Sequence, residues 1–266
     1  MDFSKMTMAA IEAALLSGEF LRRQFNTPHT ITSKEGKQNL VTECDLESER
    51  LILSFLKRQF PDHGFLSEEK GGEALSSEIV WIIDPLDGTV NFARNIPIFS
   101  ISIAACRGNE ILLGVILQPI TGELFIAEKG KGAFLNETKL QVSTVNTLDH
   151  ALLATGFPYN IDQNPMLSIE IFSSFLKMGT PLRRLGSAAL DLAYVAAGRF
   201  DSYWETGIHP WDIAAGILLI EEAGGLVSKW NGDKHLILER SDILASNSLL
   251  HASMIESLKK GRTSCN

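Results

Sequence analysis

Two aspartates, Asp84 and Asp87, follow an apolar run in a segment whose residue types suit metal chemistry. The run from Ile79 to Ile83 predicts a short buried strand that stops at Asp84 and Pro85, because proline cannot donate to a strand ladder. Two carboxylates three residues apart on such a turn can point at one place, and Mg²⁺ takes oxygen ligands of this kind. The alternative is ordinary turn chemistry, since Asp, Pro and Gly are the residues that turns favour.

Two more acids, Glu68 and Asp212, also fall at the ends of expected elements. Glu68 follows a brief apolar pair, and its alternative role is a solvated loop charge, because charged residues are mostly exposed. Asp212 lies in the first turn of an apolar helix expected over Ile213–Ala223. Element ends are where a rigid scaffold presents a site. If both acids met the aspartate pair, they would repel it unless cations lay between them. That arrangement predicts a two- or three-metal centre that transfers a phosphoryl or similar group to water.

A fifth acid, Asp45, stands three residues after Thr42, which is the spacing of a capping box. An amphipathic helix is expected to follow, through Leu56, and to stop before Pro61. Asp45 therefore has two interpretations: a helix acid in the first turn, or a member of the site.

Bulk properties favour a globular protein with a sizeable core. The chain has 266 residues, 45% of them hydrophobic, and a formal net charge of −8. That charge argues against a broad nucleic-acid-binding surface. Cys44, Cys106 and Cys265 show neither a CxxC spacing nor a disulfide framework. No signal peptide or membrane-spanning run is recognisable, so we expect a soluble, cytoplasmic protein without membrane contact.

The remaining periodicity mixes helices with strands that are expected to pair antiparallel. A meander is expected where three strand-like runs are separated by turn signals, at residues 99–105, 111–117 and 123–127. Ser187 is the expected N-cap of a helix that runs to Ala197. The fold class is therefore α+β or a layered α/β arrangement, and periodicity leaves its topology open.

Two longer motifs carry a family resemblance. Residues 84–89 read Asp-Pro-Leu-Asp-Gly-Thr, and residues 211–216 read Trp-Asp-Ile-Ala-Ala-Gly, followed by Glu-Ala-Gly-Gly at 222–225. In this order they resemble the two signatures of the inositol monophosphatase family, most closely its bacterial-type members. The likeness extends along nearly the whole chain, including residues 40–42, 68–69, 186–188 and 204–205.

This resemblance implies a layered αβαβα sandwich like that of the fructose-1,6-bisphosphatases and bisphosphate nucleotidases. It implies one domain over residues 1–266 with two closely joined lobes, a metal-binding half at about 1–145 and a substrate-side half at about 146–266. A homodimer is also expected from the family.

The resemblance further implies a set of metal ligands. Glu68, Asp84 and the backbone carbonyl of Leu86 would hold a first Mg²⁺. Asp84, Asp87 and Asp212 would hold a second, and Glu68 with water a third, weaker one. Inhibition by Li⁺ at the second position is expected.

Three residues have catalytic roles by the same resemblance. Thr89, hydrogen-bonded to Asp45, would orient the attacking water, and Glu68 would act through its metal. The alternative for Thr89 is a helix cap. The expected substrate contacts are Asp87, Gly88, Thr89, Gly186, Ser187, Ala188, Glu205 and Asp212.

Other polar positions are less specific. Glu205 matches the family position that accepts from polyol hydroxyls, and its alternative is a solvated charge at the rim. Lys34 matches a lysine near the active-site loop, and His209 is expected to be structural.

The implied activity is a Mg²⁺-dependent phosphomonoesterase that hydrolyses myo-inositol monophosphates. A sister possibility keeps the metals and changes the alcohol to fructose-1,6-bisphosphate, a 3′-phosphoadenosine nucleotide or histidinol phosphate. A second phosphate would need cationic side chains near the pocket, and Arg183 and Arg184 are the close basic pair there. An alternative of another class is a partner protein of the transcription antitermination machinery, because a fold does not fix a function.

Overall fold

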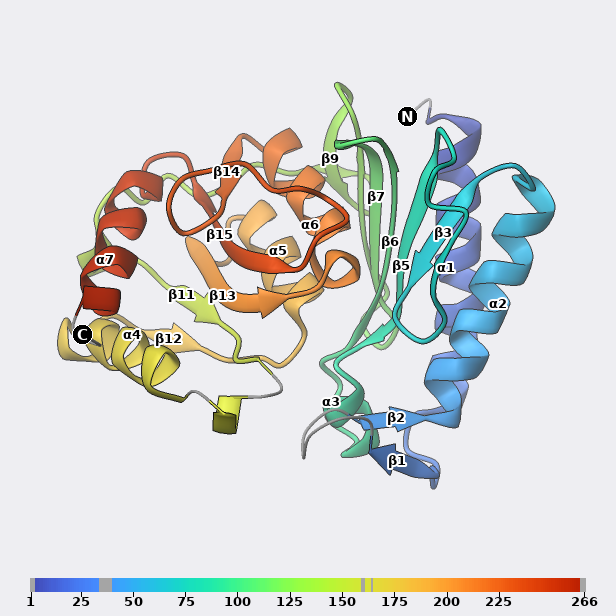
Figure 1. Ribbon diagram of the computed structural model, residues 1–266, viewed down its shortest axis with the longest axis horizontal. Helices are drawn as coiled ribbons and strands as arrows, with labels where there is room; N and C mark the ends of the chain where they lie inside the picture. The colour runs from blue at the N-terminus through green and yellow to red at the C-terminus, as the bar shows by residue number, and fades with distance from the viewer. Residues whose placement is uncertain (1–2, 34–39, 159–160, 164, 264–266) are drawn as a thin grey trace.

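Five alternating layers of helix and sheet make up the computed structural model, which describes residues 3–33, 40–158, 161–163 and 165–263. Two helices cover one face of a large sheet, two lie between this sheet and a smaller one, and two cover the far face of the smaller sheet (Figure 1). The predicted αβαβα layering is confirmed.

The large sheet has eight strands in the order β10-β9-β8-β7-β6-β5-β3-β4. Only the β3–β5 pair is parallel, and β6, β7 and β8 form the predicted antiparallel meander. The strands are β3 (Gly64–Ser67), β4 (Gly71–Glu73), β5 (Val80–Asp87), β6 (Ser100–Arg107), β7 (Glu110–Gln118), β8 (Glu123–Glu128), β9 (Gly132–Leu135) and β10 (Thr138–Lys139).

The smaller sheet has five strands in the order β12-β11-β13-β15-β14, with β11 parallel to both of its neighbours. A separate antiparallel pair joins β1 to β2. These strands are β11 (Leu153–Thr155), β12 (Leu182–Arg183), β13 (Ser202–Ile208), β14 (Gly225–Ser228), β15 (Ser241–Asn247), β1 (Ile31–Ser33) and β2 (Leu40–Thr42).

Six longer helices form the three helical layers. The outer layer on the large sheet is α1 (Lys5–Gln24) and α2 (Glu43–Gln59), the central layer is α5 (Ala188–Ala196) and α6 (Pro210–Glu222), and the other outer layer is α4 (Pro165–Lys177) and α7 (His251–Thr263). None of the helices in the described part of the chain is long and apolar enough to cross a membrane.

Strand β5 is buried on both faces, as the apolar run from Ile79 to Ile83 predicts. Val80 and Ile82 pack in the core between the two sheets, whereas Trp81 and Ile83 pack under α1 and α2. Successive side chains of a strand point to opposite faces, so one strand contributes to both cores.

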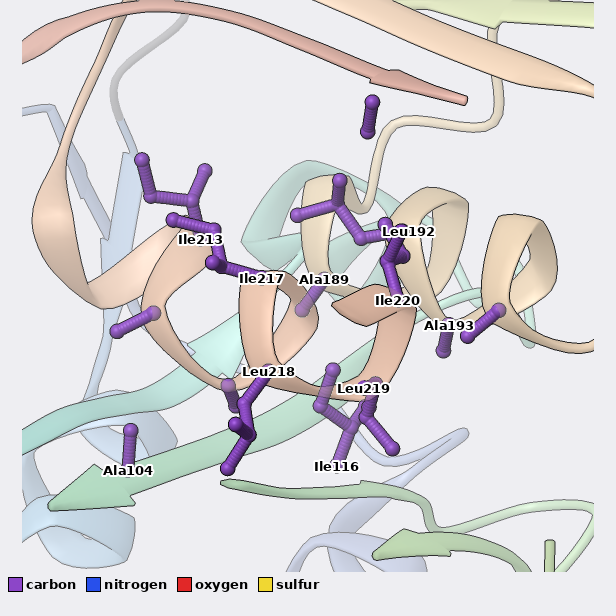
Figure 2. Close-up of a cluster of buried hydrophobic side chains, with 14 of the residues drawn as sticks. Ala104, Ile116, Ala189, Leu192, Ala193, Ile213, Ile217, Leu218, Leu219 and Ile220 are labelled. Carbon is purple, nitrogen blue, oxygen red and sulfur yellow. The ribbon is translucent and has the colours of Figure 1, made fainter. Parts of the chain in front are cut away.

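The central helix α6 is apolar and buried all round from Ile213 to Ile220, as suits a helix that is covered on both sides. Figure 2 shows its leucines and isoleucines packed against α5 and the large sheet. Gly114 on β7 permits this contact, since a Cβ there would lie 2.8 Å from the Cα of Ala215. This close packing holds α6 against β7.

Candidate active site

Three aspartates from distant parts of the chain meet at one place. Asp84 and Asp87 lie on β5, and Asp212 lies in the first turn of α6. Each offers a carboxylate oxygen within 4.8 Å of the others. The backbone N–H of His209 donates to Asp212 at 2.9 Å, which holds this carboxylate at the helix start. The predicted convergence of these three acids therefore occurs in the structure.

The strand that carries two of them continues past the predicted end. β5 runs to Asp87, whereas a stop at Asp84 and Pro85 was expected. The prediction was wrong because a bulge accommodates the proline: Asp84 pairs with Ser102 and Asp87 with Ser100, so two residues oppose one. At the bulge Pro85 is not paired with β6, so its missing N–H leaves no gap in the hydrogen bonds between the two strands.

Hydrogen bonds set the carboxylates of this bulge. The Leu86 N–H donates to Asp84 Oδ1 at 3.0 Å. Asp87 Oδ2 accepts from the Ser187 hydroxyl at 2.6 Å and from the Ala189 N–H at 2.8 Å. Ser187 is the N-cap of α5, as predicted, so the start of that helix also orients Asp87.

Glu68 lies beside this cluster at the end of a neighbouring strand. It follows β3, and its N–H donates to the Ile83 carbonyl at 3.2 Å. Because β3 and β5 are parallel, their carboxyl ends meet at the same edge of the sheet. Glu68 is not one of the three acids whose carboxylate oxygens lie within 4.8 Å of one another. Its charge nevertheless contributes to raising the pKa of both Asp84 and Asp212.

The cluster is electrostatically costly without cations. Burial, followed by the neighbouring carboxylates, raises the pKa of Asp84 well above its ordinary value. Burial, with Asp87 and Glu68 next, does the same for the pKa of Asp212. Burial raises the pKa of Asp87 to about 6, against the lowering effect of its hydrogen bonds. Hard divalent cations with oxygen ligands fit such a set, because they supply the positive charge that the carboxylates lack.

Asp45 caps α2 and also contacts Thr89. One carboxylate oxygen accepts from the Thr42 N–H at 2.8 Å and completes the predicted capping box of α2. The other accepts from the Thr89 hydroxyl at 2.7 Å. That hydroxyl has a second, longer acceptor, the Leu86 carbonyl at 3.1 Å. Thr89 begins the short helix α3 (Thr89–Ala93) after Gly88, whose φ of 95° favours glycine.

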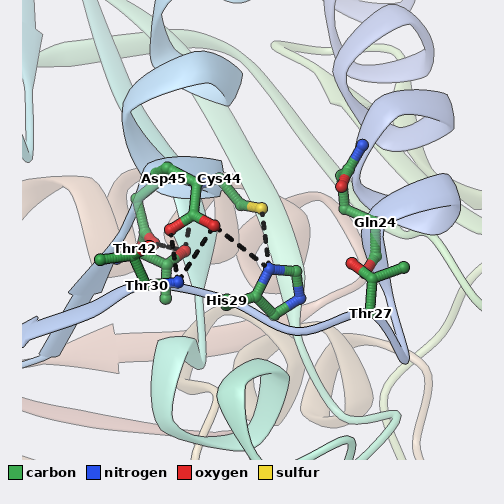
Figure 3. Close-up of polar contacts among 8 residues, drawn as sticks. Gln24, Thr27, His29, Thr30, Thr42, Cys44 and Asp45 are labelled. Carbon is green, nitrogen blue, oxygen red and sulfur yellow. Dashed lines mark hydrogen bonds and ion pairs between the residues drawn. The ribbon is translucent and has the colours of Figure 1, made fainter.

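Further polar contacts gather at the start of α2 (Figure 3). Cys44 Sγ lies 3.6 Å from His29 Nδ1. Burial raises the pKa of this thiol to about 11, so it is not a nucleophile at neutral pH. Lys34 and Cys265 lie outside the described residues.

A cleft of about 570 Å³ opens beside the aspartates. Asp87 and Asp212 line it, and so does Glu205, which lies on β13. Other predicted substrate contacts are also in its lining, namely Gly88, Thr89, Gly186, Ser187 and Ala188.

Glu205 is half-buried in this cleft and held by its neighbours. The Tyr203 hydroxyl donates to it, and burial raises its pKa to about 7. Its carboxylate packs on Gly156, where a Cβ would lie 1.9 Å from Glu205 Oε2. Of the basic pair, Arg184 lines the cleft, whereas Arg183 is exposed on β12. His209 stacks on Trp211 with 4.5 Å between the ring centroids.

Sequence reasoning missed Asp191 and Gly156, which line the same cleft. Asp191 lies on α5, is 1% exposed, and its Oδ1 has no hydrogen-bond partner among the described residues. Burial raises its pKa well above the ordinary value. The signal for Asp191 was available: it is the one acid inside the apolar run from Ala188 to Ala197. Gly156 carried no such signal.

Comparison with known proteins now decides the family. The family model described as the inositol monophosphatase family matches residues 2–262. The chain belongs to the inositol monophosphatase family. It is 39% identical over 256 residues to the Nus factor SuhB of Escherichia coli K12, covering 96% of each chain. It is also 39% identical over 260 residues to an inositol-1-monophosphatase of Mesorhizobium japonicum, covering 97% of each.

Solved structures of family members share this fold. The extragenic suppressor protein suhB of Bartonella henselae superposes with a TM-score of 0.91 at 36% identity, covering 97% of this chain and all 100% of that one. The inositol monophosphatase of Anabaena gives 0.87 at 38% identity, covering 96% and 95%. The expected family and its layered fold are therefore confirmed.

Proposed function

We propose that this protein is a Mg²⁺-dependent phosphomonoesterase that hydrolyses myo-inositol monophosphates. The observation that carries the proposal is the group of three aspartates, with Glu68 beside it, next to a cleft that Asp87, Asp212 and Glu205 line together. The names of relatives such as the Mesorhizobium japonicum inositol-1-monophosphatase support the substrate class.

The carboxylates suit two or three Mg²⁺ ions. Glu68, Asp84 and the Leu86 carbonyl would hold the first, Asp84, Asp87 and Asp212 the second, and Glu68 a third, weaker one. When bound, Mg²⁺ would neutralise phosphate charge and acidify a water molecule. Li⁺ should inhibit by competing for the second position.

The protein's own groups would orient the reactants. Thr89 donates to Asp45 at 2.7 Å, so its oxygen is free to accept from the attacking water and fix that water's orientation. The Asp45 carboxylate is held by the α2 cap and favours this orientation of the hydroxyl. Backbone N–H groups at Gly88 and Thr89 would bind phosphate oxygens.

The polyol would lie between the phosphate and Glu205. The Glu205 carboxylate would accept from ring hydroxyls, with the backbone from Gly186 to Ala188 as the opposite wall. A buried acid at this position disfavours a second phosphate, although Arg184 in the same cleft supplies one cation. In this proposal residues 1–145 carry most metal ligands and residues 146–266 carry most substrate contacts.

The test is a comparison of kcat/KM for phosphate release with Mg²⁺. The panel holds inositol 1-phosphate, fructose-1,6-bisphosphate, 3′-phosphoadenosine 5′-phosphate and histidinol phosphate. We expect inositol 1-phosphate to be preferred. Preference for another member would retain the metal chemistry and refute the substrate assignment.

A second candidate function is that of a partner protein in a transcription complex. It is favoured by several relatives that are named Nus factor SuhB. This role predicts binding to RNA polymerase or its elongation factors that survives Asp87→Asn. Absence of such binding by the purified wild-type protein would contradict it. Separately from this role, we propose that the chain forms a homodimer.

A further inference from the structure

Three buried polar side chains form a stripe on one face of α2. Asp45, Ser48 and Glu49 are three and four residues apart, which places them on neighbouring turns of the same face, and each is 0% exposed. Asp45 contacts Thr89, as described above. The Ser48 hydroxyl donates to the Pro85 carbonyl at 2.6 Å, inside the β5 bulge between the two site aspartates.

Glu49 contacts the third segment of the site. Its Oε1 accepts from the backbone N–H of Glu69 at 3.1 Å and of Lys70 at 3.0 Å. These two residues form the connection between β3 and β4, directly after Glu68. One face of α2 therefore contacts three segments that carry or adjoin proposed site residues: the start of α3, the β5 bulge, and the β3–β4 connection.

The backbone of Glu68 is consequently held from two sides. On one side its own N–H donates to Ile83 at 3.2 Å, next to the last parallel pair of β3 and β5. On the other side Glu49 binds the two peptide groups that follow. Glu68 has no freedom to shift along the sheet edge without breaking one of these contacts.

Burying the Glu49 carboxylate costs the protein more free energy than the closure of a short turn requires. Glu49 Oε2 is buried without a hydrogen-bond partner among the described residues, and burying a polar oxygen unpaired is unfavourable. The β3–β4 connection is a surface turn of a kind that local residues commonly close. A role confined to that turn accounts poorly for this cost.

We propose that Glu49 is a positioning residue that sets the metal affinity of Glu68. The inference rests on the proposed function, because it requires Glu68 to bind Mg²⁺. Groups that orient metal ligands without touching the metal commonly change its affinity by roughly tenfold to a hundredfold when replaced. Glu49 would act in this way through the backbone of residues 69 and 70.

The test is Mg²⁺ binding to the full chain, measured by calorimetry. Glu49→Gln retains an acceptor for both N–H groups but loses the charge, so we expect affinity to fall several-fold. Glu49→Ala removes the acceptor, and a fall of roughly tenfold or more is expected. Glu47→Gln is the matched control, because Glu47 is a partly exposed acid of the same helix that pairs with Arg50. This variant should bind Mg²⁺ like the wild type.

A double-mutant cycle separates positioning from general stability. In a Glu68→Gln background, Glu49→Gln should no longer change Mg²⁺ affinity, since its effect passes through Glu68. An equal loss in both backgrounds, or no loss in Glu49→Gln, would overturn the inference while the wild type still binds Mg²⁺. A wild type that binds no Mg²⁺ would overturn the proposed function and this inference together.

Discussion

Replacing Asp87 by asparagine should stabilise the metal-free protein, although the same change should abolish turnover. Burial raises the pKa of Asp87 from its ordinary 3.8 to about 6. The folded state therefore holds this proton more tightly than the unfolded state. Where the folded state binds more protons, the free energy of unfolding falls as pH rises. The loss begins above about pH 4 and is nearly complete above about pH 7.

The size of the effect follows from that pKa difference. One pKa unit corresponds to about 1.4 kcal/mol, so the ionised Asp87 costs the folded state about 3 kcal/mol at pH 7.5 and less than about 1 kcal/mol at pH 4. An asparagine amide oxygen can still accept from Ser187 and Ala189, and the charge assistance of these two bonds is already contained in the pKa of about 6. We expect Asp87→Asn to raise the free energy of unfolding by about 3 kcal/mol at pH 7.5 and by less than about 1 kcal/mol at pH 4.

Urea unfolding in EDTA, followed by tryptophan fluorescence at several pH values, measures this difference. Asp149→Asn is the matched control, because Asp149 is exposed and remote from the cleft. Mg²⁺ at saturating concentration should reverse the order, since a ligand at a thousand times its Kd adds about 4.1 kcal/mol to the protein that binds it. A variant less stable than the wild type in EDTA at pH 7.5, or an advantage that does not shrink on acidification, would refute this reasoning.

Three further substitutions test other parts of the site and fold. Thr89→Val removes the hydroxyl that donates to Asp45, so kcat should fall roughly a hundredfold with Mg²⁺ binding unchanged in calorimetry; an unchanged kcat would contradict the assigned role. Gly156→Ala forces Glu205 out of its place, so KM for inositol 1-phosphate should rise roughly tenfold in steady-state kinetics, and an unchanged KM would count against the polyol contact. Gly114→Ala should lower the free energy of unfolding by about 2 kcal/mol in urea titrations, because α6 leaves no room for a methyl group; an equally stable variant would mean that the helix yields there.

Local features of the fold were predictable because neighbouring residues determine them. The capping box of Thr42 and Asp45 and the N-cap Ser187 are confirmed. The end of β5 was predicted wrongly because Pro85 is accommodated by a bulge, and a bulge depends on the pairing with β6 rather than on the sequence of β5.

The convergence of the site was not predictable from spacing. Asp212 reaches Asp84 because α6 packs between the two sheets, and that packing depends on close contacts such as Gly114 on Ala215. Hydrophobic periodicity predicted the helices and strands but not which of them pack together. The arrangement of the elements was therefore expected only from the family resemblance. Glu49 was overlooked because, within the sequence of α2, nothing distinguishes it from an ordinary helix acid.

The most direct test of the central claim is phosphate release from inositol 1-phosphate as a function of Mg²⁺. The account predicts no turnover in EDTA, recovery on addition of Mg²⁺, and a loss of roughly a thousandfold in folded Asp212→Asn. Equal turnover with and without Mg²⁺, or normal turnover in the variant, would show that the aspartate cluster is not the metal centre of this protein.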